Sequence, residues 1–563
     1  MYRVITTTAL LMLCAGAFVM AQQPSVAPTF TPGNTDLPEG RGFIPPGHDL
    51  SHLAEATPPA GKVSALPSSW DWRSEGKVTS ITNQGSCGAC YSFAVAANFE
   101  SRILIDGGST YDLSENNLKE CHYYESSCSG GNYEMIADFL SKHGTTLESC
   151  DPYVTSDVVC NSGCTYQHTL LDWHIISGNT TPSTATLKQY IYDYGPVYTS
   201  LYAGDANDNS WQTDFNAYDG DTTLYYTDDH TTNHAVTIVG WDDDLVHAGG
   251  TGGWIVKNSW GTSWGGTCGY GAEAGYFTIA YESANIGRWS STIAGWQDYS
   301  STSDLYYYDE GGWSTSWGYG ATTCWGLSKF IVSSDHYVTR VEFWTNDVTT
   351  DVDVYLYDDF NGTAPSNLLA SRLDTSFTNA GYHSIAFSSA PQVSAGEDVY
   401  AVVKLTNSSY TFPMVSDTVS PAETATTYIS SNGASGSWYD LGTGQGDDVA
   451  LRIRTSPTLS LDVGDDDTPT PSDFRLENNY PNPFNAGTTI SYHLSQRQQV
   501  TLTIYDLLGR KVRTLFEGNQ SAGDHEITWD GHTDHGGEAA TGVYVYRLNA
   551  GEHSASKKML LLK

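Results

Sequence analysis

One cysteine in a short glycine-rich block is the residue of this chain best suited to nucleophilic chemistry. Cys90 ends the sequence Asn83-Gln84-Gly85-Ser86-Cys87-Gly88-Ala89-Cys90, and the apolar residues of the stretch 91–104 share one helical face. A thiol attacks only as a thiolate, and the unpaired amides at a helix start favour an anion. We therefore predict that Cys90 is a nucleophile rather than half of a disulfide.

Other residues complete a catalytic set around such a thiolate. His234 lies 144 residues after Cys90 and opens a strand-like run, where it would accept the thiol proton and form an ion pair. The side-chain carbonyl of Asn258, 24 residues further on, would hold the second ring nitrogen, and Trp260 would cover that bond. The amide of Gln84 would donate to a developing oxyanion. We expect this chemistry to need no cofactor and no metal.

The composition indicates an exported, acidic, globular protein. The chain has 563 residues, enough for three or more domains, with 39% hydrophobic residues and a formal charge of −38 at pH 7. Because this surface repels phosphate backbones, we expect no nucleic-acid partner. Ten cysteines, less Cys14 and Cys90, leave eight, an even number that suits disulfides in an oxidising compartment.

Shifts in composition predict six segments. The first has the pattern of a signal peptide, and no later stretch is long enough to span a membrane. The segments are 1–21, the signal peptide; 22–66, a short propeptide; 67–297, the segment with the catalytic set; 303–455, a β-sandwich of alternating strands; 456–472, a linker; and 473–563, a small β-domain. Within the propeptide, residues 40–53 are predicted to cross the active site, because the pair Pro45-Pro46 would resist cleavage.

Residues 66–290 resemble the papain family of cysteine peptidases. The resemblance is carried by the Cys90 block and by Leu66-Pro67, Trp70–Arg73, Leu113–Cys121, Cys128–Gly131, Gly195–Val197, Asn233–Ala235 and Asn258–Gly261. It implies a two-lobed α+β fold, in which a helical lobe carries the nucleophile and a β-barrel lobe carries the histidine. Peptides are expected to bind in the cleft between the lobes.

The same resemblance implies which residues contact the substrate. The substrate backbone should pair with Gly131, next to Gly130 and near Trp260. The pocket for the side chain two residues before the cut should be lined by Tyr133, Ser200, Thr232 and Ala235. Two departures from the family are Tyr91, where a Trp is usual, and a prosegment shorter than that of plant and animal relatives.

The family pattern also implies disulfides. It pairs Cys87 with Cys128 and Cys121 with Cys160, which leaves Cys150 with Cys164 and Cys268 with Cys324. The last pair would tie the catalytic segment to the β-sandwich. Spacing alone shows none of these pairs, since eight cysteines allow 105 connectivities.

The two β-domains carry resemblances of their own. Residues 303–455 resemble the lectin-like domains that follow bacterial peptidases of this kind, so a glycan partner is left open, although aromatic strands more often form core. Residues 473–563 resemble the C-terminal sorting domain of type IX secretion in Bacteroidetes-like bacteria, through Leu476–Asn485, Ile504–Arg510 and Lys557–Lys563. An ordinary immunoglobulin-like spacer is the alternative.

We therefore expect a secreted or cell-surface thiol protease, made as a zymogen, that cuts protein or peptide substrates as an endopeptidase. Type IX machinery would be its export partner. Two alternatives stay open. One is a surface adhesin or glycan-binding protein on an inactive peptidase scaffold, against which the intact catalytic set weighs. The other is an exopeptidase, in which a loop within residues 202–230 would block one end of the cleft.

Overall fold

The computed structural model describes two compact units, divided at residues 462 and 463. The described residues are 23–28, 37–53, 65–124, 126–387 and 389–458, and in the C-terminal part 474–476, 479, 484–485, 487–494, 498–506, 510–520, 523–534, 536–550 and 553–562. The predicted signal peptide, and the predicted linker beyond residue 458, lie outside them. Within the described residues, no helix is long and apolar enough to cross a membrane.

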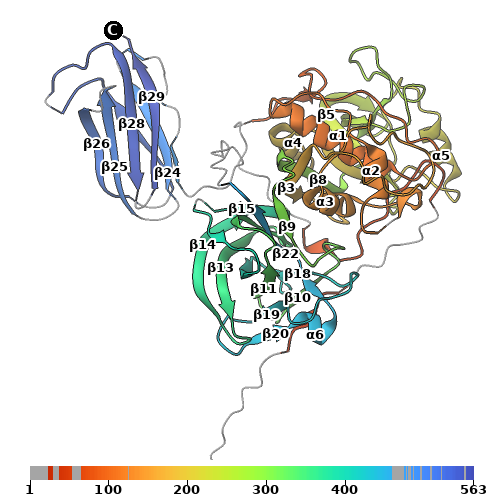
Figure 1. Cartoon of the computed structure of the whole chain (residues 1–563). Coiled ribbons are helices and arrows are strands. Elements are labelled where there is room, and N and C mark those ends of the chain that lie inside the picture. The colour runs from red at the N-terminus through yellow and green to blue at the C-terminus, as the bar shows by residue number, and fades with distance from the viewer. Residues whose placement is uncertain are drawn as a thin grey trace, which may run out of the picture. The chain divides into compact units, whose positions relative to one another are not determined.

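The helix that begins with the predicted nucleophile, α1 (Cys90–Ile105), crosses the middle of the first domain, residues 65–298 (Figure 1). Most of its side chains are buried, and small residues such as Ala94 and Ala97 let strands approach it closely. The helix predicted over residues 91–104 is confirmed and is one residue longer at each end. The other helices are α2 (Glu115–Glu120), α3 (Tyr133–Lys142), α4 (Thr184–Tyr194), α5 (Asn209–Asn216) and α6 (Leu441–Gln445), with short 3-10 turns at Ser51–Leu53, Ser127–Ser129 and Ser283–Asn285.

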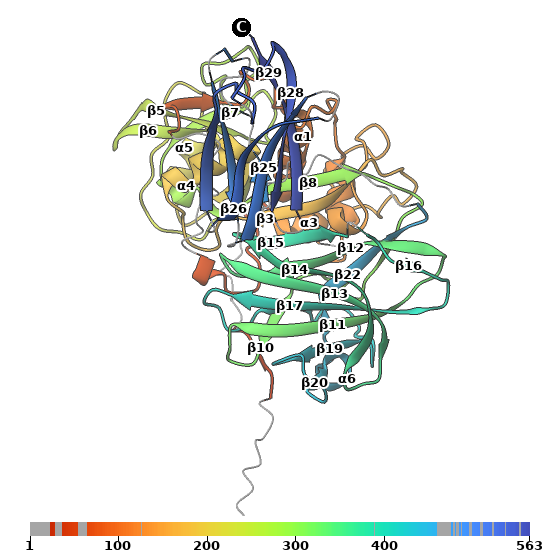
Figure 2. The ribbon, with the colours of Figure 1, turned by 90° about the vertical axis from the view of Figure 1, so that its left-hand side faces the viewer.

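One sheet runs from the first domain into the β-domain, residues 304–456. Its strands are β2 (Ser69–Asp71), β3 (His168–Ile175), β4 (Val197–Leu201), β5 (His234–His247), β6 (Gly250–Lys257), β7 (Tyr276–Ala280), β8 (Arg288–Asp298), β9 (Asp304–Tyr306), β12 (His336–Thr345), β15 (Ala380–Ala386), β16 (Gln392–Val393) and β22 (Leu451–Ser456). The order β7-β6-β5-β4-β8-β3-β15-β12-β22-β9 places β3 of the first domain beside β15 of the β-domain (Figure 2). Gly381 permits this pairing, because a Cβ there would stand 1.8 Å from the carbonyl oxygen of Trp173.

The β-domain is a sandwich, as predicted. Two further sheets pack with the continuous one around a core that includes Phe343, Val354 and Val403. Their strands are β1 (Ser25–Val26), β10 (Thr315–Gly318), β18 (Met414–Asp417) and β21 (Asp448–Val449) in one, and β11 (Thr323–Ile331), β13 (Thr350–Phe360), β14 (Pro365–Phe377), β17 (Asp398–Asn407), β19 (Thr427–Ser430) and β20 (Trp438–Asp440) in the other. Strand β1 adds a short segment from the chain's beginning to this domain.

The two domains also share a buried ionic cluster, which we call the seam cluster: Asp138, Lys142, Asp309 and Arg452. The guanidinium of Arg452 on β22 contacts both carboxylate oxygens of Asp309, with Nε 3.0 Å from each, and its Nη2 lies 2.5 Å from the Asp138 carboxylate on α3. Lys142 Nζ donates to the same Asp138 carboxylate at 2.7 Å. Because each charge is buried among opposite ones, the contact between the domains is fixed in one geometry.

The described part of the chain contains three disulfides, all in the first domain. They join Cys87 to Cys128, Cys121 to Cys160 and Cys150 to Cys164. The expected pair between Cys268 and Cys324 is wrong, since both are free thiols. Cys324 lies on β11 with no exposed surface, inside the core of the sandwich, whereas Cys268 packs in the first domain near Arg73. An even cysteine count therefore did not imply complete pairing.

The C-terminal unit consists of two small antiparallel sheets around their own core. The strands are β23 (Phe474–Leu476), β24 (Thr488–Leu494) and β27 (Gly523–Trp529) in one sheet, and β25 (Gln498–Asp506), β26 (Lys511–Gln520), β28 (Gly542–Ala550) and β29 (His553–Leu561) in the other. Apolar residues that alternate along the strands, among them Ile490, Leu502, Trp529 and Tyr546, face the interior.

Candidate active site

The predicted nucleophile and general base come from two different lobes and meet at the start of α1. The Sγ atom of Cys90 accepts a hydrogen bond from the backbone N–H of Ala235 at 3.3 Å. Ala235 directly follows His234, the first residue of β5. The first residue of a helix and the first residue of a strand are both held rigidly, so the thiol and the imidazole are kept in one neighbourhood.

The imidazole of His234 is oriented by Asn258, as predicted. Its Nε2 lies 2.8 Å from Asn258 Oδ1, and the indole of Trp260 covers the ring with centroids 4.9 Å apart. Among the described residues, Nδ1 of His234 is buried and has no hydrogen-bond partner. With Nε2 fixed, Nδ1 is the nitrogen available to exchange a proton with Cys90.

Gln84 is also held in place. Its side-chain carbonyl accepts from Ser259 Oγ at 2.6 Å, and its Nε2 donates to the carbonyl of Cys87 at 2.9 Å. An amide nitrogen has two hydrogens, so one stays free to donate. The side chain is completely buried, which keeps that donor in a single orientation.

Residues 37–53, which we call the cleft segment, lie across this site. Ile44 donates its N–H to the carbonyl of Gly131 at 3.0 Å, Gly131 donates to the carbonyl of Gly42 at 2.9 Å, and Phe43 pairs with Gly131 in a parallel bridge. Phe43 also donates to the carbonyl of Asn233, the residue before the catalytic histidine. Of residues 40–53, which were predicted to cross the active site, residues 42–44 make these contacts with Gly131 and Asn233, rather than the two prolines.

The approach of the cleft segment depends on glycine. A Cβ on Gly42 would stand only 1.7 Å from the carbonyl oxygen of Gly88, and one on Gly130 would stand 2.9 Å from the carbonyl oxygen of Gly42. No side chain fits between these backbones. By contrast, a Cβ on Gly47 would meet nothing within 4 Å.

Arg41 brings a buried positive charge to the catalytic residues. Its Nη2 donates to the carbonyl of Ala203 at 2.6 Å and to Oδ1 of Asn216 at 2.8 Å, and its guanidinium lies 5.2 Å from the centre of the Trp260 ring. Burial lowers the pKa of Arg41 to about 10, so the group remains charged at neutral pH. This charge opposes protonation of the nearby His234.

Beneath the cleft segment, burial favours the neutral forms of Cys90 and His234. Burial raises the pKa of the Cys90 thiol to about 12, although backbone N–H groups and the charge of Arg41 partly oppose that rise. Burial also lowers the pKa of His234 to about 3, although the hydrogen bond that its Nε2 donates to Oδ1 of Asn258 opposes this fall. Thiol and uncharged imidazole are therefore the stable forms at neutral pH while the segment is in place.

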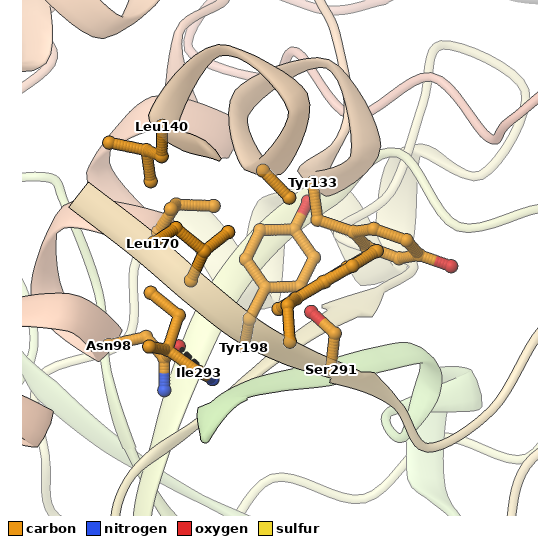
Figure 3. A pocket seen from close by; sticks show the side chains of 10 residues that line it. Asn98, Tyr133, Leu140, Leu170, Tyr198, Ser291 and Ile293 are labelled. Atoms are coloured by element: carbon orange, nitrogen blue, oxygen red, sulfur yellow. Dashed lines mark hydrogen bonds between the residues drawn. The ribbon is translucent and has the colours of Figure 1, made fainter. Parts of the chain in front are cut away.

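The four residues predicted to line the substrate pocket are all buried. Ser200 pairs with Ala235 between β4 and β5, and its hydroxyl donates to Thr232 Oγ1 at 2.8 Å. Tyr133 is completely buried and packs on Tyr198 with ring centroids 5.3 Å apart. The two tyrosines and Asn98 of α1 line a small, mostly apolar pocket (Figure 3), and neither Cys90 nor His234 lines it. That pocket belongs to the packing of the lobes.

Comparison with known proteins agrees with this geometry. Residues 66–296 match the family described as papain family cysteine protease. These residues form a papain-like cysteine peptidase domain. Residues 305–453 match the lectin-like domain family and residues 482–554 match the FlgD Ig-like domain family.

Individual relatives match about two fifths of the chain. The chain is 33% identical over 218 residues to the senescence-specific cysteine protease SAG12 of Arabidopsis thaliana, which covers 38% of this chain and 57% of that protein. It is 33% identical over 226 residues to cysteine proteinase 2 of Entamoeba histolytica, covering 39% of this chain and 66% of that protein. The chain thus spans less than two thirds of the length of these relatives.

A solved structure shares the arrangement of two domains. It contains the cysteine protease and lectin-like domains of Cwp84, described as a surface layer associated protein of Clostridium difficile. The TM-score is 0.62, with 20% identity, over 78% of this chain and 99% of that one. The papain-like fold followed by a β-rich lectin-like domain is therefore shared, at an identity that supports the fold alone.

Several residues of the papain-like site were not singled out from the sequence. Ser259 holds Gln84, Phe43 and Arg41 fill the cleft, and Trp289 lies 6.5 Å from the ring of Phe43. The sequence did contain a signal for the cleft contacts of Arg41 and Phe43, because glycines alternate with larger residues in Gly40-Arg41-Gly42-Phe43. Such alternation is typical of a segment whose backbone approaches another closely.

Proposed function

We propose that this protein is an exported cysteine endopeptidase that is made in a latent form. The observation that carries the proposal is the convergence of Cys90, His234 and Asn258, with Sγ on the N–H of Ala235 and Nε2 on Oδ1 of Asn258. An inactive scaffold would have no need of a buried asparagine that orients the imidazole, nor of a fixed amide at Gln84. The adhesin alternative is therefore not favoured.

The proposed reaction uses the residues of this site in fixed roles. Once the cleft segment leaves, water and substrate reach the pair, and His234 takes the proton of Cys90. The thiolate attacks the peptide carbonyl, while the free hydrogen of Gln84 and the N–H of Cys90 stabilise the oxyanion. His234 then protonates the leaving amine, which leaves a thioester, and water activated by His234 hydrolyses it.

The cleft segment is proposed to act as the propeptide. It supports latency in three ways: its backbone occupies Gly131, where a substrate would bind; it excludes water from the catalytic pair; and Arg41 opposes the imidazolium. Beyond the cleft, His48 stacks on Trp313 and His52 stacks on Tyr410, both in the β-domain. The β-domain would thus help to hold the propeptide.

Substrate preference is proposed from the side chain that fills the cleft. Phe43 is 1% exposed and belongs to the same apolar cluster as Ala235, Tyr133 and Trp289. A pocket that buries a phenyl ring would favour aromatic or large aliphatic side chains in substrates. The proposed substrates are unfolded proteins and peptides with such residues.

Labelling and hydrolysis test the proposed activity. The chain without residues 1–66 should be labelled at Cys90 by an epoxysuccinyl peptide and should hydrolyse an unfolded protein under mild reductant. Cys90→Ser should lose both. Full activity of Cys90→Ser, or full resistance of the wild-type chain to the inhibitor, would contradict the assignment.

Export is proposed to use both ends of the chain, through a signal peptide at 1–21 and the C-terminal unit as a sorting domain for type IX secretion. The C-terminal unit has an Ig-like match, no cysteine and its own core, which suits a separate recognition module. Deleting residues 473–563 should leave peptidase activity intact and retain the enzyme in the periplasm. Equal release of the truncated and full-length chains into the medium would make this unit a spacer.

A further inference from the structure

Two histidines and an aspartate meet where the papain-like domain joins the β-domain. Asp172 and His174 lie on the same face of β3, and His383 comes from β15, which pairs with β3 at this point. One ligand atom from each residue lies within 4.8 Å of the other two. The cluster is built from both domains and lies outside the catalytic site.

The hydrogen bonds around His383 indicate that a positive charge lies between this imidazole and the Asp172 carboxylate. The hydroxyl of Thr345 donates its single hydrogen to the carbonyl of Asn379 at 3.0 Å, because a carbonyl can only accept. At its distance of 2.9 Å, Nε2 of His383 must then be the donor to Thr345 Oγ1. In the neutral ring this leaves the lone pair of Nδ1 facing Oδ1 of Asp172, 2.8 Å away. Two lone pairs at that distance need a positive charge between them.

The imidazole of His174 also makes its polar contact with the Asp172 carboxylate. Nε2 of His174 lies 3.2 Å from the other oxygen of Asp172, whereas its Nδ1 is buried without a hydrogen-bond partner among the described residues. Atoms bound to one ion at about 2.0–2.2 Å lie about 2.8–3.6 Å apart for bond angles between 90° and the tetrahedral angle, a range that includes the separations of 2.8 and 3.2 Å between Asp172 and the two imidazoles. The stacked ring of Phe377, centred 4.0 Å from that of His383, fixes the imidazole plane.

We propose that Asp172, His174 and His383 bind a divalent transition-metal ion, most favourably zinc, which links the papain-like domain to the β-domain. Two imidazoles and one carboxylate suit zinc, cobalt or nickel rather than calcium or magnesium, which prefer oxygen ligands alone. The Asp172 side chain is 21% exposed, whereas those of His174 and His383 are 8% and 1% exposed. An ion can therefore enter beside the carboxylate, and water can complete its coordination. Thr345 acts as the outer partner that fixes which nitrogen of His383 binds.

From the sequence we expected no metal, because the ligands proposed here are far apart in the chain. Asp172 and His174 form an unremarkable Asp-x-His pair on a strand, and the third ligand lies 211 residues beyond Asp172. Only the pairing of β3 with β15 brings it near.

Metal binding to the full chain tests the proposal. Cys90→Ser is used as the background, so that the catalytic thiol contributes no ligand. After treatment with a chelator and its removal, Zn²⁺ is titrated by calorimetry and thermal unfolding is followed with and without Zn²⁺. We expect about one tight equivalent and a higher Tm with metal. Asp172→Asn and His383→Gln should lose this equivalent, Thr345→Val should weaken it about 10- to 100-fold, and His247→Ala, outside the cluster, should keep it.

The position of the ion is tested directly in crystals of the Cys90→Ser chain soaked in Zn²⁺, so the outcome does not depend on how well the variants fold. An anomalous difference peak between the three side chains supports the proposal. No peak at that position, or an unchanged tight equivalent in both Asp172→Asn and His383→Gln, overturns it, and the charge between Asp172 and His383 is then a proton.

Discussion

The cleft and the seam cluster are both buried, but they are buried in different ways. In the cleft, the thiol, the imidazole and the amides are neutral and are covered by backbone hydrogen bonds from residues 40–44, which a substrate backbone could replace. In the seam cluster, the charges of Arg452, Asp309 and Asp138 are paired with one another. These side chains are at most 7% exposed, so water does not replace the charged partners. We propose that the first burial is reversed when the cleft segment leaves, which suits regulation, whereas the second suits the joining of two domains.

The largest expected effect is on the stability that the seam cluster provides. Arg452→Met leaves Asp309 and Asp138 buried without their main partner, which should cost about 3–5 kcal/mol of unfolding free energy. Chemical denaturation of the first unit, residues 1–462, measures this. Lys329→Met, which removes a half-exposed pair with Asp398, should cost less than about 1 kcal/mol. An equal loss of unfolding free energy in the two variants would show that the seam cluster does not stabilise the contact between the domains.

The next effect tests whether the cleft is covered by close backbone contact. Gly42→Ala forces a Cβ onto the carbonyl of Gly88, and overpacking of this kind costs about 1–3 kcal/mol, which raises the uncovered population about 5- to 150-fold. Labelling of Cys90 in the full chain by an epoxysuccinyl peptide should accelerate accordingly. Gly47→Ala, with open space around its Cβ, should label at the wild-type rate. If both variants label alike, the glycine contact does not restrain the segment.

A smaller effect concerns the catalytic geometry after the segment has left. Asn258→Ala removes the acceptor 2.8 Å from Nε2 of His234, and the loss of a hydrogen bond to a ring that becomes charged should lower kcat about 10- to 100-fold. His234→Ala should abolish turnover. Steady-state kinetics of the chain without residues 1–66 measure both variants. An unchanged kcat in Asn258→Ala would remove Asn258 from the catalytic set.

The smallest effect concerns pH and the exit of the cleft segment. Burial lowers the pKa of His52 in the docked segment, while a released His52 regains its ordinary value near 6.5. The docked state therefore keeps its full stability above that value and loses stability as pH falls below it. Labelling of Cys90 in the full chain should speed up several-fold with acidification. His52→Gln, which can still donate to the carbonyl of Asn346, should flatten this dependence, and an unchanged pH profile would exclude His52 as its source.

The same contrast explains what could be predicted from the sequence. The residues proposed as catalytic are chemically distinctive types at the starts of α1 and β5 and directly after β6, so short local blocks were sufficient to propose them. The crossing of the active site by residues 40–53 was also foreseen, although through the prolines rather than through Gly42. A strand pattern predicted the β-sandwich, because alternation is a local property.

The contacts between the domains could not be predicted in this way. Arg452 meets Asp138 across 314 residues of chain, and nothing near either residue in the sequence signals the other. The expected disulfide between Cys268 and Cys324 failed for the same reason: counting cysteines says nothing about which of them face a core. Buried polar partners from different domains are defined only by the fold.

The reactivity of Cys90 before and after removal of the cleft segment tests the central claim, a latent thiolate-imidazolium site, most directly. Iodoacetamide alkylation of the peptide that contains Cys90 is followed by mass spectrometry across pH, with the fully buried Cys324 as an internal control. In the full chain, Cys90 should resist alkylation throughout the neutral range. After removal of residues 1–66, it should react rapidly at pH values well below the ordinary thiol pKa of about 8.5, because His234 stabilises the thiolate. Equal rates before and after removal, or the pH profile of an ordinary thiol, would contradict the account.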